Sequence, residues 1–403
     1  MRIPQRGAFS NLMKRLFLML CLPGVALAAP EPSLEKSLGP ILAASFKPGL
    51  PGVAALIVKD GQPVFRRAYG MANVELGVPL RPEHVFRIGS TTKLFTATAV
   101  MLLVDEGEIA LDQPVSTYLP DAPAHWAKVT IEHLLTHTSG IPNLSMDSGY
   151  WRTTARLEHT LDELIAPVRT RPLLSEPGTQ FAYNNTGYNL LAAVVEKVSG
   201  LEFFQFVDRC IAQPLQLKNT TPGDDKKLIA GLVTGYRSGP APAWLIANST
   251  LSAAGGMVST VDELAAFMLA LQSGKLVSPA GVKKMNTSYV LPDGKATGYG
   301  LGTWVRTVEG NRLVGHGGYV FNFYSQLEMD IDAGIVAVTL HNGDKFGGDN
   351  EELSKRMILL ARGAAPVLKA GRAPQTSAHA ARPPRNDRAR ARRPGPAPAP
   401  GPG

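Results

Sequence analysis

A polar Ser-x-x-Lys sequence, Ser90-Thr91-Thr92-Lys93, lies between two apolar runs and constrains the chain around it. The segment that follows, from Leu94 to Val104, is apolar almost all round before Asp105-Glu106-Gly107 stops it. A segment that is apolar on every side is typical of a buried helix. The sequence therefore predicts a buried helix that begins near Ser90.

This spacing also suggests chemistry. Residues three apart lie on one face of a helix, so the Lys93 amine is expected beside the Ser90 hydroxyl, at the positive end of the helix. Burial disfavours the charged form of a lysine, so Lys93 can accept the hydroxyl proton and activate Ser90 as a nucleophile. The alternative is that Ser90 only caps the helix and Lys93 is a solvated first-turn residue. Four residues by themselves do not decide between the two.

The first 28 residues predict a secretory signal peptide. Four basic residues precede a run from Leu16 to Ala28 that is apolar or small throughout. A membrane anchor needs about 20 apolar residues, and this run is shorter and contains Pro23-Gly24. We therefore expect an exported protein, periplasmic or secreted.

Cleavage of that segment removes Cys21 and leaves Cys210 as the one cysteine of the mature chain. No intramolecular disulfide is then expected. Cys210 lies in an apolar helical pattern from Phe203 to Ile211, which predicts a buried small hydrophobe rather than a nucleophile.

The other end of the chain, residues 363–403, is rich in Ala, Pro, Arg and Gly and cannot bury a core. This tail carries a net charge of +7 and the first 29 residues carry +4, so the formal +8 leaves −3 for residues 30–362. The folded part therefore gives no indication of nucleic-acid binding. We expect a disordered basic tail, with weak contact to an anionic surface such as cell wall or membrane lipid as the alternative.

The folded domain is placed at residues 29–362, which exceeds the size of about 250 to 300 residues at which a single core usually stops growing. Apolar runs at 53–58 and 64–69 flank Asp60-Gly61, a strong indication of an antiparallel hairpin. Comparable strand patterns return only at 300–305, 319–329 and 334–340. Most segments between these two β regions have helical patterns.

These patterns predict an α+β fold with two lobes. An antiparallel sheet from about 45–85 and 295–362 is flanked by N- and C-terminal helices, and residues of about 90–290 form a mainly helical lobe. Ser90 would lie at the junction of the lobes, where active sites tend to form.

Three helices are expected around this frame. A weak pattern at 34–46 is broken by Gly39-Pro40. Thr260 to Glu263 forms a capping box that opens a helix which Gly274 can end. Asn350 can cap a helix over 351–362.

A second polar loop, Tyr183-Asn184-Asn185, precedes an apolar helical pattern. Most tyrosines are packed aromatics, and that is the alternative for Tyr183. A phenol held at a helix start can also relay protons, but its ordinary pKa is about 10, so we expect a neighbouring cation to lower it.

The third candidate is His316-Gly317-Gly318-Tyr319. Glycines allow a backbone to approach a ligand closely and leave N–H groups directed at an oxyanion. The alternative is a tight strand connection.

His133 and His137 are four residues apart, which is one spacing of metal ligands. The glutamate and third ligand of the zinc protease pattern are absent. We therefore predict no metal and no cofactor. The chain also has no Gly-x-Ser-x-Gly nucleophile elbow, which argues against an α/β-hydrolase.

Taken together, these stretches resemble the serine β-lactamase and penicillin-binding protein superfamily, in particular its class C-like branch of D-aminopeptidases, D-alanyl-D-alanine carboxypeptidases and carboxylesterases. The resemblance covers about residues 45–345 and rests on the three motifs at Ser90, Tyr183 and His316 in the family's order. The run His133 to Pro142 and the run Ser252 to Met257 support it.

The resemblance implies a serine hydrolase that forms an acyl-enzyme on an amide or ester, namely a D-alanyl or D-amino peptide, a β-lactam or a carboxylic ester. Ser90 would be the nucleophile, and Lys93 and Tyr183 would share the proton transfers. Asn185 would orient Lys93 and the substrate amide. The backbone N–H groups of Ser90 and Tyr319 would form the oxyanion hole.

His316 stands where many relatives carry the lysine of a Lys-Thr-Gly triplet. An unperturbed histidine has a pKa near 6.5. We therefore expect weaker recognition of a substrate carboxylate, improving as the pH falls toward 6. The competing hypothesis is a penicillin-binding or sensor protein that is acylated but does not turn over.

Overall fold

The computed structural model describes residues 32–237, 241–243, 246–343 and 350–364. The predicted signal peptide, residues 1–28, and the predicted tail beyond residue 364 lie outside the described residues. Within those described ranges, none of the helices combines the length and the apolar character that crossing a bilayer requires.

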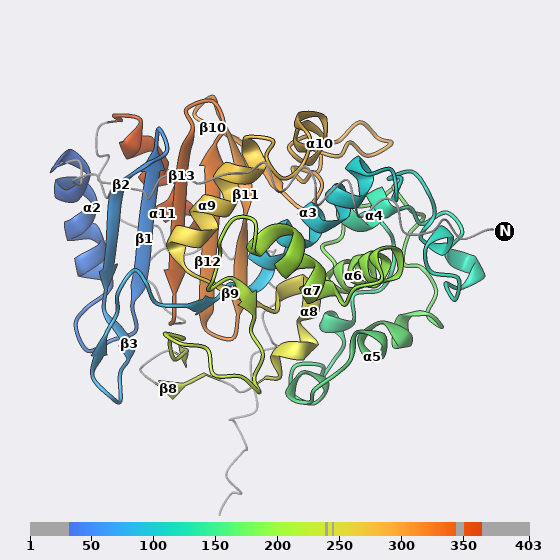
Figure 1. Ribbon diagram of the computed structural model, residues 1–403, viewed down its shortest axis with the longest axis horizontal. Helices are drawn as coiled ribbons and strands as arrows, with labels where there is room; N and C mark the ends of the chain where they lie inside the picture. Colours follow the sequence, from blue (N-terminus) through green and yellow to red (C-terminus); the bar gives the residue numbers. More distant parts are fainter. Residues whose placement is uncertain (1–31, 238–240, 244–245, 344–349, 365–403) are drawn as a thin grey trace, which may run out of the picture.

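A six-stranded antiparallel sheet forms one side of the molecule, with strand order β10-β11-β12-β13-β1-β2 (Figure 1). Its strands are β1 Val53–Lys59, β2 Gln62–Tyr69, β10 Trp304–Val308, β11 Asn311–Val320, β12 Phe323–Asp330 and β13 Ile335–His341. β1 pairs with β13, with Val53 opposite His341. The early hairpin and the late strands therefore belong to one sheet, as predicted.

The early hairpin turns at Asp60 and Gly61, whose φ angles are 52° and 73°. Both angles lie in the left-handed region that a two-residue type I′ turn requires. The dipeptide thus accounts for the pairing of β1 with β2.

The late strands differ from the prediction in two places. The run 319–329 is not one strand, because Phe321 and Asn322 turn with φ angles of 35° and 75° between β11 and β12. β10 begins at Trp304 rather than at residue 300, since Gly302 has a left-handed φ of 78° that interrupts the extended backbone.

Helices cover both faces of the sheet. Helices α2 Pro32–Ser45 and α11 Asn350–Ala361 pack on one face, and α9 Val261–Gln272 lies across the other (Figure 1). Along β1, alternate side chains enter two separate apolar cores: Val53, Ala55 and Ile57 face α2 and α11, and Ala54, Leu56 and Val58 enter the larger core. This double burial explains why β1 is apolar at nearly every position.

The predicted break of the first helix at Gly39-Pro40 is wrong. α2 runs unbroken through Pro40, which is exposed. Proline costs a helix one hydrogen bond, but Leu34, Leu38 and Leu42 are buried against the sheet along this helix. Tertiary packing of that face outweighs the local preference.

The start of α9 confirms half of the predicted capping box. The Thr260 side chain accepts the N–H of Glu263. The Glu263 carboxylate does not return to the Thr260 backbone, because it accepts hydrogen bonds from Asn219 and Thr220 instead. Gly274 follows the last turn with a φ of 75°.

The rest of the chain forms the helical region. Its helices are α3 Thr92–Asp105, α4 Ile131–Leu135, α5 Leu161–Ile165, α6 Asn185–Ser199, α7 Phe203–Val207, α8 Ser252–Gly255 and α10 Pro279–Met285. Short strands join it to the sheet side: β3 Met71–Asn73, β4 Val78–Pro79, β5 Phe86–Arg87, β6 Thr221–Pro222, β7 Tyr236–Arg237, β8 Ala241–Pro242 and β9 Met257–Ser259. Cys210 is buried here, and burial raises the pKa of its thiol to about 11, as expected of a small hydrophobe.

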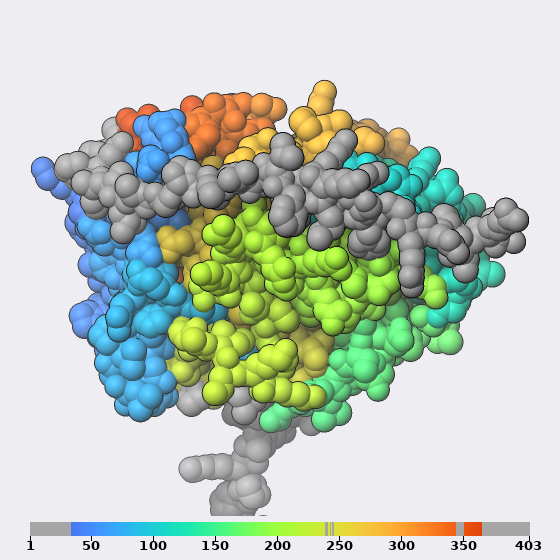
Figure 2. Space-filling view, in the orientation of Figure 1, coloured from blue at the N-terminus to red at the C-terminus, as the bar shows by residue number. Residues whose placement is uncertain are grey.

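The two lobes share one core. α9 falls inside the predicted helical lobe but packs on β1 and β13, and the larger apolar cluster extends from β1 through α3 to α6. In the space-filling view of Figure 2, the yellow-green residues of the helical region lie directly against the blue residues of the early strands. α3 is buried over nearly its whole length at this junction, as predicted.

Candidate active site

Ser90 lies in a single helical turn, Gly89–Thr91, between β5 and α3. α3 begins at Thr92, its N-cap is Thr91, and no side chain caps it. The alternative in which Ser90 serves as a cap is therefore wrong. Ser90 is partly exposed, whereas Lys93, one turn later, is completely buried. The alternative of a solvated Lys93 is wrong as well.

The Lys93 amine has three polar neighbours. Its Nζ lies 2.8 Å from Asn185 Oδ1, 2.7 Å from the carbonyl oxygen of Ala254 and 3.3 Å from Ser90 Oγ. The first two atoms accept hydrogen bonds and cannot donate them, so Lys93 donates to both. Burial lowers the pKa of Lys93 well below its ordinary value. A neutral amine has two N–H groups and one lone pair, which leaves the lone pair for the Ser90 hydroxyl.

The loop before α6 brings a phenol to the same hydroxyl. Tyr183 forms a hydrogen bond with the Ser90 side chain, and its ring centroid lies 4.8 Å from Lys93 Nζ. Asn184 caps α6, since its Oδ1 accepts the N–H of Gly187 at 3.0 Å. Asn185 is anchored on its other side, where Nδ2 donates to Ser145 Oγ at 3.0 Å.

Tyr183 differs from the expectation that a neighbouring cation lowers its pKa. Burial raises the pKa of this phenol above its ordinary value. The same burial lowers the pKa of the adjacent Lys93 amine, so this amine does not offset the effect of burial on the phenol. Tyr183 therefore carries its proton, and it can donate a hydrogen bond or pass that proton on.

The glycine run lies inside β11, not in a strand connection, and packs against the turn that carries Ser90. A Cβ at Gly318 would lie 2.1 Å from the Ile88 carbonyl oxygen and 2.9 Å from the Ser90 nitrogen. A Cβ at Gly89 would lie 3.0 Å from the Tyr319 nitrogen. Only glycine permits this approach, which places the backbones of Ser90 and Tyr319 side by side.

The remaining predicted residue of this strand, His316, is 1% exposed. Its Nδ1 lies 2.6 Å from the Gly317 carbonyl oxygen, an acceptor, so Nδ1 carries the proton. Its Nε2 lies 2.9 Å from the Tyr299 hydroxyl, which then donates to it. Burial lowers the pKa of His316 to about 3. The expectation that His316 becomes charged near pH 6 and then favours a carboxylate is therefore contradicted.

The other two histidines do not form a metal site. α4 ends at Leu135 and His137 has a φ of 60°, so His133 and His137 do not share a helix face. His133 Nδ1 accepts the N–H of Thr130 in a capping box. Over the ranges that the structure describes, no three or more His, Cys, Asp or Glu side chains are grouped to hold a metal ion.

Two contacts at this site could not be predicted from any pattern in the sequence. The Ala254 carbonyl belongs to α8, and the run from Ser252 to Met257 supported the resemblance without indicating that it touches Lys93. Tyr299, which holds His316, lies between two glycines outside any regular element. Both are backbone or loop groups brought to the site by the fold.

Two aromatic side chains from segments that contact the Tyr183 loop and follow Tyr319 meet each other. The Trp151 ring lies 5.2 Å from the Phe321 ring, centroid to centroid. Phe321 follows β11 two residues after Tyr319. Trp151 belongs to a segment whose beginning contacts the Tyr183 loop, where Asn143 Nδ2 donates to the Tyr183 carbonyl at 3.1 Å. The segment from Asn143 to Trp151 thus contacts both the Tyr183 loop and Phe321, which follows β11.

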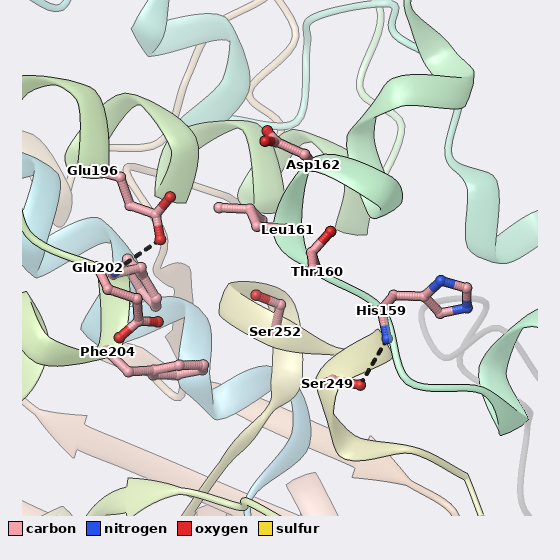
Figure 3. Close-up of a pocket in the computed structure, with 10 residues that line it drawn as sticks. His159, Thr160, Leu161, Asp162, Glu196, Glu202, Phe204, Ser249 and Ser252 are labelled. Carbon is pink, nitrogen blue, oxygen red and sulfur yellow. Dashed lines mark hydrogen bonds between the residues drawn. The ribbon is translucent and has the colours of Figure 1, made fainter.

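A separate surface pocket of about 410 Å³ lies in the helical region (Figure 3). Its lining includes Asp162, Glu196 and Glu202, and none of the predicted site residues. Two of these carboxylates already stabilise the start of α7, since Glu196 accepts the N–H of Phe203 and Glu202 accepts the N–H of Gln205. The acidic character of this pocket therefore has a structural explanation.

A family model described as β-lactamase matches residues 31–362. The chain belongs to the β-lactamase family. Among relatives in this family, esterase EstB of Burkholderia gladioli is 36% identical over 190 residues, which are 42% of this chain and 46% of EstB. The putative penicillin-binding protein PbpX of Bacillus subtilis is 28% identical over 313 residues, covering 74% of this chain and 73% of PbpX. The D-aminopeptidase of Brucella anthropi is 24% identical and is covered over 59% of its length.

Solved structures of the family have the same fold. A penicillin-binding protein homologue from Pyrococcus abyssi gives a TM-score of 0.70 at 30% identity, over 83% of this chain and 77% of that chain. A D-stereospecific amidohydrolase from Streptomyces sp. gives 0.68 at 28% identity, over 81% and 97%. The predicted fold and the predicted resemblance are confirmed, and the relatives' names include an esterase, a D-aminopeptidase and an amidohydrolase. The chain spans less than two thirds of EstB and of the D-aminopeptidase.

Proposed function

We propose that this member of the β-lactamase family is a serine hydrolase that cleaves esters or amides through an acyl-enzyme on Ser90. The observation that carries this proposal is the buried Lys93 amine, whose Nζ lies 3.3 Å from Ser90 Oγ and within 2.8 Å of two acceptors, Asn185 Oδ1 and the Ala254 carbonyl oxygen. In its neutral form this amine has a lone pair left for the Ser90 hydroxyl. Burial lowers the pKa of this amine, which favours its action as a general base.

In the acylation step, Ser90 Oγ bonds to the substrate carbonyl carbon while the hydroxyl proton moves to Lys93. The carbonyl oxygen becomes an oxyanion beside the backbones of Ser90 and Tyr319, which Gly318 brings together. Tyr183 passes a proton to the leaving alcohol or amine and is reprotonated from Lys93, and the carbon–oxygen or carbon–nitrogen bond breaks. The product of this step is an ester on Ser90 with Lys93 again neutral.

In the deacylation step, a water molecule attacks the Ser90 ester. Its proton goes to the Lys93 and Tyr183 pair, its oxygen bonds to the acyl carbon, and Ser90 Oγ leaves with a proton. Asn185 keeps its place in both steps, since it accepts from Lys93 at 2.8 Å and donates to Ser145 at 3.0 Å.

The charge of the site supports an uncharged substrate. His316 is neutral at physiological pH and both of its ring nitrogens are occupied within the protein. It therefore provides no cation for a substrate carboxylate. The partly exposed rings of Trp151 and Phe321, whose centroids lie 5.2 Å apart, offer apolar surface, and Phe321 lies two residues beyond Tyr319 in the sequence. We infer that neutral esters and amides with an apolar acyl group suit this site better than carboxylate-bearing β-lactams.

A substrate panel on wild type and Ser90→Ala tests this proposal. Short and long acyl p-nitrophenyl esters, D-amino acid amides, D-alanyl peptides and a chromogenic cephalosporin are assayed together, with fluorophosphonate and fluorescent penicillin as labels. We expect ester or amide turnover and fluorophosphonate labelling that depend on Ser90. If wild type turns over none of the substrates and reacts with neither label, the hydrolase proposal is contradicted. A penicillin adduct that persists for hours without turnover supports the sensor hypothesis instead.

We also propose that the chain is exported, and we keep weak contact of its basic tail with an anionic surface as the alternative to a tail that has no binding role. The support is the sequence of residues 1–28 and the net charge of +7 on residues 363–403. Cell fractionation followed by N-terminal sequencing tests export, since a mature N-terminus near residue 29 is expected. Binding of the mature chain to anionic vesicles, with and without the tail, tests the second part.

A further inference from the structure

His137 holds the backbone on both sides of Tyr183. The carbonyl oxygen of His137 accepts the N–H of Ala182 at 2.8 Å. The Nδ1 atom of the same residue accepts the N–H of Asn184 at 3.0 Å. The two peptide N–H groups that flank the Tyr183 residue are therefore bound to one histidine.

The hydrogen bond from Asn184 also determines which nitrogen of His137 carries its proton. Since Nδ1 accepts, the proton of the neutral ring is on Nε2. No acceptor for this N–H occurs among the described residues, and the imidazole is 1% exposed. Burial lowers the pKa of His137 well below its ordinary value, which keeps the ring neutral and Nδ1 able to accept.

The imidazole also supports the phenol ring. Its centroid lies 4.3 Å from the centroid of Tyr183 and 4.7 Å from that of Tyr299, the residue that binds His316. Tyr183 is bordered on another side by Trp304, whose ring is parallel to it within 3°. His137 thus binds the backbone N–H groups on either side of Tyr183 and also packs against the Tyr183 ring.

The backbone of His137 has an unfavourable conformation. Its φ of 60° lies in the left-handed region, which a non-glycine residue rarely adopts outside asparagine, aspartate and histidine. α4 has ended two residues earlier, so the angle belongs to a specific turn and not to a helix. Glycine would relieve the angle but would provide no acceptor for Asn184.

We propose that His137 is a positioning residue for the hydrolysis reaction, which holds the Tyr183 hydroxyl in hydrogen-bonding reach of Ser90. This inference rests on the proposed function and assigns a role that the metal-like spacing of His133 and His137 did not suggest. Three backbone contacts fix the loop: His137 binds the N–H groups of 182 and 184, and Asn143 binds the Tyr183 carbonyl.

The chain offers an informative pair of substitutions at this position. His137→Ala removes the acceptor and leaves the buried Asn184 N–H unpaired. His137→Asn keeps an acceptor, because an asparagine Oδ1 occupies nearly the place of a histidine Nδ1, and asparagine tolerates a positive φ. We expect His137→Ala to lower kcat by about 10- to 100-fold with little change in KM, and His137→Asn to stay within about threefold of wild type.

A double-mutant cycle with Tyr183→Phe separates positioning from a general loss of structure. If His137 acts through the Tyr183 hydroxyl, His137→Ala lowers kcat in wild type but changes it less than about twofold once that hydroxyl is gone. Equal losses in both backgrounds overturn the proposal. Thermal unfolding and circular dichroism of all four proteins show whether each variant is folded.

Failure of the His137 proposal can be distinguished from failure of the hydrolase proposal. If wild type neither turns over a substrate nor reacts with a fluorophosphonate, the hydrolase proposal fails. If wild type is active but the cycle is additive, only the role of His137 fails. Should His137→Ala not fold, His137→Asn decides: a folded His137→Asn that loses as much activity as Tyr183→Phe contradicts positioning by the Nδ1 contact.

Discussion

Gly318→Ala is the sharpest single test of the proposed oxyanion site, because it adds one methyl group where β11 packs against the backbone of Ile88 and Ser90. The new Cβ would lie 2.1 Å from the Ile88 carbonyl oxygen, 2.5 Å from Ser325 Oγ and 2.9 Å from the Ser90 nitrogen. Gly318 has an extended strand backbone, so alanine suffers no φ strain there. The whole effect is therefore steric.

The size of the effect follows from these distances. The Ile88 contact reaches 3.0 Å only after the two backbones separate by about 0.9 Å. A displacement of this size moves the Ser90 turn away from β11 and increases the distance between the backbone N–H groups of Ser90 and Tyr319. Loss of one oxyanion donor typically lowers kcat by about 10²- to 10³-fold, or about 2.7–4 kcal/mol. Overpacking should also cost about 1–3 kcal/mol of unfolding free energy.

The assay is steady-state hydrolysis of the best ester of the panel, combined with the rate of fluorophosphonate labelling and the thermal unfolding midpoint. We expect the loss in kcat and in labelling rate, with KM changed much less. Gly317→Ala is the matched control in the same strand. Its Cβ would meet Gln326 Oε1 at 2.5 Å, the end of a flexible side chain that can turn away. The loss there should be at least tenfold smaller.

Gly39→Ala in α2 is a control for adding a methyl group without a steric clash. The nearest atom to the new Cβ would be the Tyr69 hydroxyl, at 3.5 Å. This substitution should leave activity unchanged and stability equal or slightly higher. The reasoning is refuted if Gly318→Ala keeps kcat within fivefold of wild type at an unchanged unfolding midpoint. It is also refuted if Gly317→Ala is as severe as Gly318→Ala.

Three further predictions concern other parts of the molecule. Burial lowers the pKa of Lys93 well below 10.5, so the unfolded chain binds more protons than the folded protein just below that pH, and the free energy of unfolding should rise as the pH approaches 10.5 from below. Lys93→Met should flatten this rise in chemical denaturation and abolish acylation, and an unchanged slope contradicts the lowered pKa of Lys93. Because burial raises the Cys210 pKa to about 11, a thiol reagent at pH 8 should label it only after denaturation, and fast labelling of the native protein contradicts this. Trp151→Ala removes the ring that contacts Phe321 and should lower kcat/KM for long acyl esters at least tenfold more than for acetyl esters, so an equal effect on both excludes Trp151 from acyl recognition.

The early hairpin and the buried helix after Ser90 were predictable from the sequence because local residue patterns determine them. Asp60-Gly61 selects a tight hairpin turn, and a nearly continuous apolar segment after Lys93 predicts a buried helix. Helical spacing places Lys93 beside Ser90 whatever surrounds them. The expected break at Gly39-Pro40 failed for the opposite reason, because burial of Leu34, Leu38 and Leu42 is a tertiary effect that outweighs a local one.

The protonation of the site residues depends on the tertiary structure. The sequence placed Ser90, Lys93, Tyr183 and His316 among the candidate residues, but protonation depends on desolvation and on partners from distant segments. Burial in the folded protein lowers the pKa of Lys93 well below its ordinary value. Burial likewise lowers the pKa of His316, to about 3. Spacing along the chain determines which residues can meet, whereas packing determines the charge they carry when they do.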